Sequence, residues 1–71
     1  METCYVKGEY IQLNQLLKRE NLAASGGEAR GLIEQGLVKV NGQVAGEIRK
    51  KIRGGDVVEY GEYVLKIEIE E

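Results

Sequence analysis

The segment Ser25–Gly42 constrains the fold of this chain more than any other part of the sequence. Its first four residues, Ser25–Glu28, match the capping box S-x-x-E, in which the serine oxygen accepts a hydrogen bond from the backbone of the fourth residue. Gly36 supplies the left-handed conformation that ends many helices. The apolar residues between these two signals fall at helical spacing and are Ala29, Leu32 and Ile33. The segment therefore predicts a short helix between Ser25 and Gly36.

A tight hairpin is expected after this helix. Residues 38–44 alternate apolar and polar side chains around Asn41-Gly42, a dipeptide typical of two-residue hairpin turns. The alternation predicts that Lys39 faces water. The valines expected to face the helices are Val38, Val40 and Val44.

A second helix and several strands are predicted from the rest of the chain. Leu13, Leu16 and Leu17 fall on one helical face and predict a helix over about residues 12–20. A strand is expected near Cys4–Val6. Residues 57–60 and 63–70 alternate about Gly61-Glu62 and predict a final hairpin. The expected fold class is α+β, with two short helices packed on a small antiparallel or mixed sheet of about four to five strands.

Length and composition limit the possible functions. A chain of 71 residues predicts one small domain over 1–71, and no apolar run approaches the ~20 residues of a membrane span. With one cysteine and no histidine, we expect no internal disulfide, no zinc site and no cofactor. The sequence has neither a phosphate-binding glycine loop nor a histidine for acid–base work, so a non-enzymatic protein is predicted. From the single cysteine and the lack of a signal-peptide pattern, we expect a cytoplasmic location.

Charge is unevenly distributed along the chain. Residues 18–53 contain eight cations and four acids, a net of +4, whereas residues 56–71 contain six acids and one lysine, a net of −5. The densest basic stretch is Arg49–Arg53, in which Arg49, Lys51 and Arg53 would share one side of an extended segment. A local positive field attracts a polyanion even when the total charge is −2. Such residues also serve simply as solvated surface, and both interpretations remain open here.

The sequence resembles the alpha-L RNA-binding motif, the domain named after small-subunit ribosomal protein S-four. The matching residues are Leu13-Asn14, Leu17, Ser25, Ala29, Ile33, Gly36-x-Val38-x-Val40-Asn41-Gly42 and Gly55-Asp56. The resemblance spans about residues 11–58, followed by the C-terminal hairpin at 57–70. Residues 9–18, Ser25–Ala29 and Arg49–Lys51 are more narrowly similar to the small stand-alone bacterial proteins of this superfamily.

This resemblance implies that RNA lies against the start of the second helix and the strand and turn after it. The candidate RNA-binding residues are Gln12, Asn14, Ser25, Gly26, Gly27, Arg30, Lys39, Asn41, Gly42, Arg49, Lys50, Lys51 and Arg53. Unpaired amides at a glycine-rich helix start suit a phosphate. The amide of Asn41 could contact the ligand, but the pair Asn41-Gly42 is better explained by its turn. Gln12, Asn14 and Gly26 stand where the family often has Arg, Asp and Arg, which shifts the expected contacts toward the backbone amides and residues 49–53.

The predicted function is non-catalytic binding of structured RNA, mainly through phosphates and helix shape. Ribosomal or transfer RNA is the ligand class that the resemblance implies. Because few exposed aromatic rings are expected, stacking on single-stranded bases is not favoured. The alternative is a protein-interaction module or ribosome-associated adaptor, in which a sheet edge and the acidic end, Glu68, Glu70 and Glu71, dock a basic partner.

Overall fold

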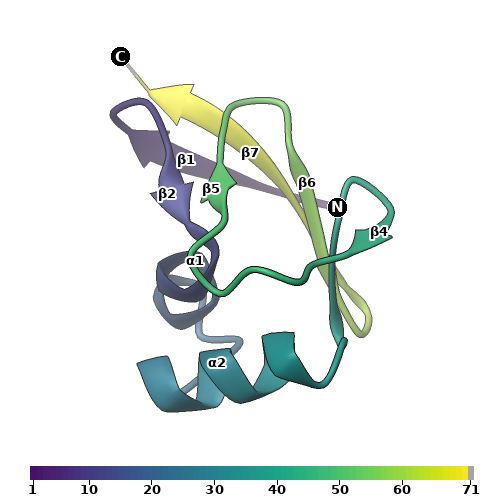
Figure 1. Cartoon of the computed structure of the whole chain (residues 1–71). Helices are drawn as coiled ribbons and strands as arrows, with labels where there is room; N and C mark the ends of the chain where they lie inside the picture. Colours follow the sequence, from purple (N-terminus) through teal and green to yellow (C-terminus); the bar gives the residue numbers. More distant parts are fainter. Residues whose placement is uncertain (71) are drawn as a thin grey trace.

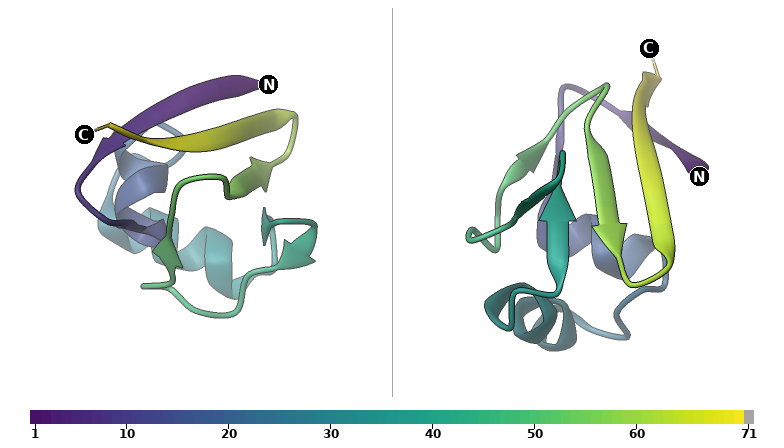
Figure 2. Two further views of the ribbon diagram at one scale, coloured as in Figure 1. Left: turned by 90° about the horizontal axis from the view of Figure 1, so that it is seen from above. Right: turned by 90° about the vertical axis from the view of Figure 1, so that its right-hand side faces the viewer.

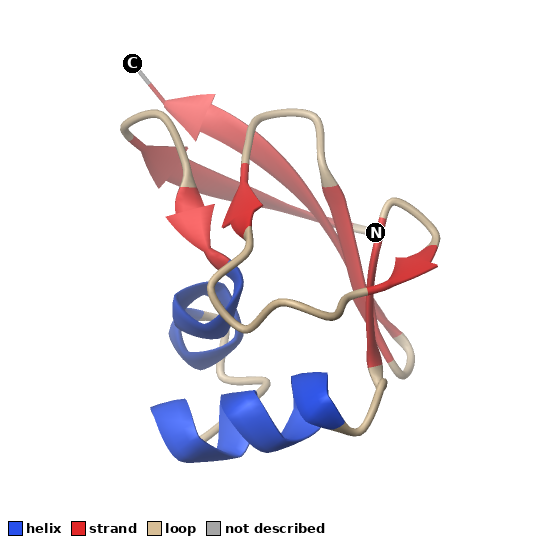
Figure 3. Cartoon of the chain, viewed as in Figure 1, coloured by secondary structure: helices blue, strands red, loops and turns tan. Residues whose placement is uncertain are grey.

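The structure, a computed structural model, describes residues 1–70. Two helices cover one face of a five-stranded sheet, and a two-stranded ribbon closes one end (Figures 1 and 3). The elements in chain order are β1 (Glu2–Lys7), β2 (Ile11–Gln12), α1 (Leu13–Arg19), α2 (Gly26–Glu34), β3 (Val38–Val40), β4 (Gln43–Val44), β5 (Lys51–Ile52), β6 (Val57–Tyr60) and β7 (Tyr63–Glu70). The α+β class, with two helices on a small sheet, is confirmed.

The large sheet is mixed. Its strand order is β1-β7-β6-β3-β4; β1 runs parallel to β7, and the other pairs are antiparallel. Figure 2 shows β1 and β7 side by side, with the two chain ends at opposite ends of this pair. The open edges are therefore β1 and β4. The acidic strand β7 lies inside the sheet, so its backbone already pairs with a strand on each side. Glu71, the last acid of the predicted docking segment, lies outside the described residues.

The β3–β4 hairpin turns at the predicted dipeptide. Asn41 and Gly42 both have positive φ, 52° and 83°, as a type I′ turn requires. The prediction that Val44 faces the helices is wrong. A two-residue turn pairs Val44 with Lys39, so both lie on the outer face, and Val44 is 59% exposed. The next residue, Ala45, is buried instead.

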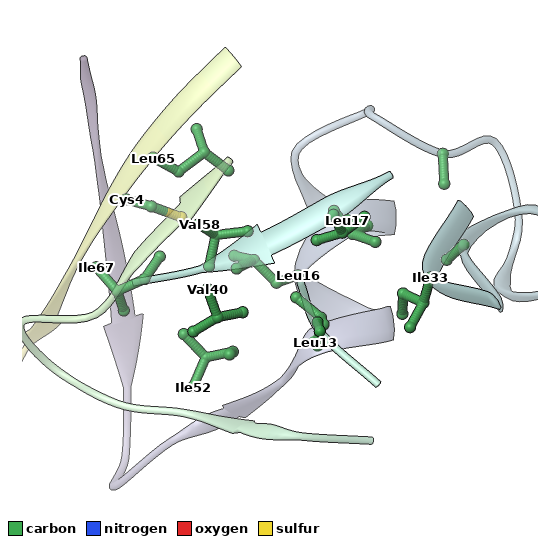
Figure 4. Close-up of a cluster of buried hydrophobic side chains, with 14 of the residues drawn as sticks. Cys4, Leu13, Leu16, Leu17, Ile33, Val40, Ile52, Val58, Leu65 and Ile67 are labelled. Atoms are coloured by element: carbon green, nitrogen blue, oxygen red, sulfur yellow. The ribbon is translucent and has the colours of Figure 1, made fainter. Parts of the chain in front are cut away.

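The core lies between the helices and the inner face of the sheet (Figure 4). The predicted leucines of α1, Leu13, Leu16 and Leu17, are fully buried, and so are Val38 of β3 and Ile67 of β7. Ile52 carries the ribbon into the same core, because its side chain is also fully buried. This packing fixes the ribbon and both helices to one sheet. Among residues 1–70, no helix is long and apolar enough to cross a membrane.

The start of α1 is closed by backbone rather than by a side chain. Its N-cap residue, Gln12, makes no side-chain capping bond. Instead, the amides of Leu13 and Asn14 donate to the carbonyls of Lys50 and Ile48, at 2.8 and 3.1 Å. The segment between β4 and β5 is therefore tied to the first turn of α1. As a result, these two helix-start amides are not available to a ligand.

Candidate nucleic-acid interface

The start of α2 carries uncovered backbone. Ser25 Oγ accepts from the amide of Glu28 at 3.1 Å, and the Ser25 carbonyl accepts from Ala29, so the serine half of the predicted capping box is present. Within residues 1–70, the amides of Gly26 and Gly27 have no hydrogen-bond acceptor. Helix amides of this kind carry partial positive charge and attract anions.

Neither glycine of this helix start is needed by the fold itself. Both have helical backbone, and a Cβ at Gly26 would meet no atom within 4 Å. A Cβ at Gly27 would meet only Ser25 Oγ, at 3.9 Å. Glycine inside a helix costs about 0.5–1 kcal/mol relative to alanine. The fold thus tolerates a side chain here, and what two glycines provide is an open approach to the backbone.

A shallow pocket lies at this helix start. We call it the entrance pocket; its lining residues are Asn14, Gly26, Gly27, Arg30, Ile48 and Arg49. The backbone around Arg49 is fixed, because the carbonyls of Ile48 and Lys50 on either side of it accept from α1. The fold thus brings an exposed guanidinium to the uncovered amides of α2.

Two other residues complete the entrance pocket. Arg30, one turn into α2, is exposed and donates to the Glu34 carboxylate at 2.8 Å, an i,i+4 surface pair worth about 0.3–0.5 kcal/mol. Asn14 presents its side chain to the same pocket, while its Oδ1 is buried without a hydrogen-bond partner among residues 1–70. Both predicted residues therefore lie beside Arg49.

The basic segment is not one extended rail, and that prediction is wrong. Residues 47–50 form a turn, in which the Lys50 amide faces the Glu47 carbonyl at 3.4 Å, and only Lys51–Ile52 is strand. Arg49 therefore joins the entrance pocket, whereas Lys50 lines a separate hollow beside the β3–β4 hairpin. The turn arises because the chain must bend to give its carbonyls to α1.

Lys51 and Arg53 lie instead on the outer face of the β2–β5 ribbon. Gln12 is opposite Lys51 in the antiparallel register, and Ile11 is opposite Ile52. Because Ile52 points into the core, its neighbours point outward. We call this outer surface the ribbon face; it consists of Tyr10, Gln12, Lys51 and Arg53. The predicted residues Gln12, Lys51 and Arg53 are thus brought together, and Tyr10 joins them.

Tyr10 is the residue that the sequence prediction missed. Lys51 Nζ lies 5.0 Å and Arg53 Cζ 5.8 Å from the centre of its ring. The available signal was the alternation on both strands: with Ile11 and Ile52 facing inward, residues 10, 51 and 53 share the outside. Tyr10 is 38% exposed, so an accessible ring does exist near the cations, contrary to expectation.

The side-chain amide of Asn41 is used in hydrogen bonds within the protein. Its Nδ2 donates to Asp56 Oδ1 at 3.0 Å, and its Oδ1 accepts from the Val57 amide at 2.8 Å. Asp56 Oδ2 also accepts from the Arg53 amide. Asn41 therefore joins the hairpin tip to the turn before β6, and Gly42 supplies the second positive φ of the hairpin turn.

Lys39 lies on the opposite side of the sheet from α2. Its neighbours Val38 and Val40 are buried against the helices, so its own exposed side chain faces away from them. In register it is beside Glu59 and Val44. The structure does not bring Lys39 to the entrance pocket, contrary to the expectation that it flanks the glycine amides.

Comparison with known proteins identifies this architecture. The model of the S4 domain matches residues 4–68. The chain belongs to the S4 domain family. Its structure is similar to the solution structure of YbcJ from E. coli, with a TM-score of 0.72 and 33% sequence identity over 96% of this chain and 87% of YbcJ. The solution structure of YbcJ revealed an αL motif that is involved in RNA binding. No curated protein matches this S4 domain.

Proposed function

We propose that this S4 domain binds structured RNA through its phosphate backbone, with the entrance pocket as the main contact. The observation that supports it most directly is the position of Arg49 beside two helix-start amides that the fold leaves unpaired and uncovered. A phosphate oxygen accepts from amides and guanidinium together. Membership of the S4 family and the likeness to YbcJ support RNA as the source of that phosphate.

The contacts available favour shape over sequence. The groups at the entrance pocket are mostly donors, two of them backbone amides, and such donors contact phosphate and sugar rather than base edges. An A-form helix presents phosphates and 2′-hydroxyls along its wide minor groove, within reach of a rigid surface of this kind. A folded ribosomal or transfer RNA is the proposed ligand class, and the protein's part is binding without catalysis.

The test adds a methyl group where the phosphate would lie. In the double variant Gly26→Ala, Gly27→Ala, each Cβ has room within the protein, so unfolding should require about 1–2 kcal/mol more free energy. If the amides bind phosphate, RNA affinity should fall about tenfold, because the backbone is then shielded. Urea denaturation and fluorescence anisotropy with a structured RNA measure the two effects.

Gly31→Ala is the matched control. Gly31 lies in the same helix, and its Cβ would meet only the end of the Gln35 side chain, at 3.8 Å. It should raise the free energy of unfolding by about 0.5–1 kcal/mol, half the gain of the double variant, and leave RNA affinity unchanged. Equal affinities for the wild type and the double variant would contradict the proposal. Cross-linking in cells, followed by sequencing of the recovered RNA, would identify the ligand; a recovery that contains only protein would favour an interaction module.

A further inference from the structure

The ribbon face places one aromatic ring and two cations together outside the entrance pocket. Arg53 is opposite Tyr10 when the β2–β5 register is continued by one residue, and Lys51 is its diagonal neighbour. Both cations lie within about 6 Å of the ring centre, the range of cation–π attraction. At an exposed site this attraction is worth only about 0.5–1 kcal/mol, so it orients the cations without neutralising them.

Both cations remain available to an anion. Within residues 1–70, no carboxylate oxygen lies within 4.0 Å of the Lys51 ammonium or the Arg53 guanidinium. The Asp56 carboxylate accepts from the backbone amide of Arg53, and Glu9 and Glu70 border the same hollow as Arg53. The four residues of the ribbon face carry two positive charges and no negative one. An aromatic surface beside free cations is the combination that binds unpaired nucleotides, because the base stacks while its phosphate meets the charge.

Tyr10 also lines a hollow outside the ribbon face. It shares this hollow with Tyr5, Gln15 and Arg19. Tyr5 is 58% exposed on β1, and Arg19 is held in place because its guanidinium donates to the Tyr5 carbonyl. The hollow leaves room for a planar ligand beside Tyr10.

The ribbon face continues directly from the entrance pocket. Gln12 precedes Asn14 by two residues, and Lys51 follows Arg49 by two, so the two surfaces adjoin along both segments. Two residues of chain span at most about 7 Å. A strand with one phosphate beside Arg49 would thus bring a neighbouring nucleotide to Lys51, Arg53 and Tyr10.

Only an unpaired nucleotide can use this ring. Inside a duplex, each base is covered on both faces by its neighbours, whereas an unpaired base at a bulge, in a loop or in a single-stranded tail has a free face. We propose that Tyr10, with Lys51 and Arg53, stacks one unpaired nucleotide next to the RNA helix that the entrance pocket holds. The preferred ligand of this S4 domain is then a junction between duplex and single strand. This inference depends on the proposed function.

The experiment compares two RNAs that differ only in an unpaired tail. Fluorescence anisotropy at fixed salt measures the affinity for a 12-base-pair blunt RNA duplex and for the same duplex with a three-nucleotide tail. Wild type should bind the tailed RNA more tightly. Tyr10→Leu keeps apolar bulk and removes the aromatic face, so affinity for the tailed RNA should fall about 5- to 100-fold, as expected for one lost stack. Its affinity for the blunt duplex should stay within about twofold.

Two variants serve as controls. Tyr10→Phe keeps the ring and should keep the preference for the tailed RNA. Tyr63→Leu removes a more accessible tyrosine, 53% exposed against 38% for Tyr10, at the β6–β7 turn on the side of the molecule away from the ribbon (Figure 1). It should change neither affinity. If Tyr10→Leu lowers both affinities equally, or neither, the stacking site does not exist.

A measurement on the wild type removes any dependence on the folding of the variant. With 2-aminopurine as the first unpaired base, stacking on Tyr10 should quench its fluorescence on binding, and unchanged fluorescence in the complex would overturn the inference. A different result would contradict the proposed function itself, namely that wild type binds neither RNA. If the blunt duplex binds and the Gly26→Ala, Gly27→Ala variant weakens it, while the tail adds nothing, only the stacking site is excluded.

Discussion

Asn41 is at the tip of the β3–β4 hairpin, yet its side chain reaches back to the turn before β6. Two hydrogen bonds, to Asp56 and to the Val57 amide, use its carboxamide, and its φ of 52° suits the turn. The sequence left two roles open for this residue, a turn former and a contact for RNA. The structural role could not be seen from the sequence because Asp56 and Val57 are distant along the chain.

Asn41→Gly separates these two roles. Glycine accepts the positive φ of the turn but loses both side-chain bonds, so the free energy of unfolding should fall by about 1–3 kcal/mol. RNA affinity under native conditions should stay within about twofold. Urea denaturation and anisotropy measure both. A variant as stable as wild type that binds RNA weakly would show that the amide serves the ligand instead.

Cys4 is a second residue whose environment makes a prediction. Burial, with smaller contributions from the Glu20 carboxylate, raises the pKa of its thiol from 9.0 to about 11, despite the opposing charge of Arg19. The unfolded chain therefore loses this proton at lower pH than the folded protein does. The thiol contributes stability that is complete below pH 9 and is lost as the pH rises to about 11.

A comparison with Cys4→Ala isolates this effect. The free energy of unfolding of wild type should fall between about pH 8.5 and 10.5 by about 1–2 kcal/mol more than that of the variant. Denaturation at several pH values measures the difference. Parallel pH profiles would contradict the prediction.

At the scale of elements, local signals predicted the structure correctly and long-range ties were missed. The α2 start and the β3–β4 turn were predictable because each depends on residues within a few positions, Ser25–Glu28 and Asn41-Gly42. The turn at 47–50 was not, because its carbonyls are held by the amides of Leu13 and Asn14 in another element. Because of these hydrogen bonds, Arg49 lies at the entrance pocket, whereas Lys51 and Arg53 lie on the ribbon face.

Ser25 tests whether the start of α2 serves stability, binding or both. Ser25→Asp keeps a capping oxygen and suits the helix dipole, so stability should stay within about 0.5 kcal/mol of wild type. The added negative charge beside the glycine amides should lower RNA affinity about tenfold. Ser25→Ala is the counterpart: it loses the cap and about 1 kcal/mol of stability, with little change in affinity. Thermal denaturation and anisotropy measure both, and an unaffected affinity in Ser25→Asp would count against the entrance pocket.

At the scale of the whole molecule, the fold separates many acids of the C-terminal segment from the cations beside α2. The outer face of the sheet, away from the helices, holds acids next to lysines: Glu59 beside Lys39, Glu70 beside Lys7, and Glu68 3.4 Å from Lys66. Much of the acidic C-terminal segment is thereby balanced at a distance from α2. A net charge of −2 is thus compatible with a positive surface at the entrance pocket and ribbon face.

This separation predicts how binding depends on salt. With about four phosphates neutralised, the logarithm of RNA affinity should fall with the logarithm of salt concentration at a slope of roughly −3 to −4. Arg49→Gln should reduce the magnitude of the slope by about one. Lys39→Gln makes the same charge change on the opposite face and should leave the slope unaltered. Anisotropy titrations over roughly 50 to 300 mM salt measure the slope for all three proteins. A slope near zero would exclude phosphate binding.

The parallel pairing of β1 with β7 has a consequence for biosynthesis. Glu2 leaves the ribosome before its partner Leu65, which lies 63 residues later in the chain (65 − 2). Until β7 has been translated, β1 has no partner strand, and the side chains of Cys4 and Val6, which are buried in the folded protein, remain exposed. The helices and the central hairpins can assemble during this time. The nascent chain is most vulnerable to aggregation and proteolysis during this interval, and docking of the first strand is the step that ends it.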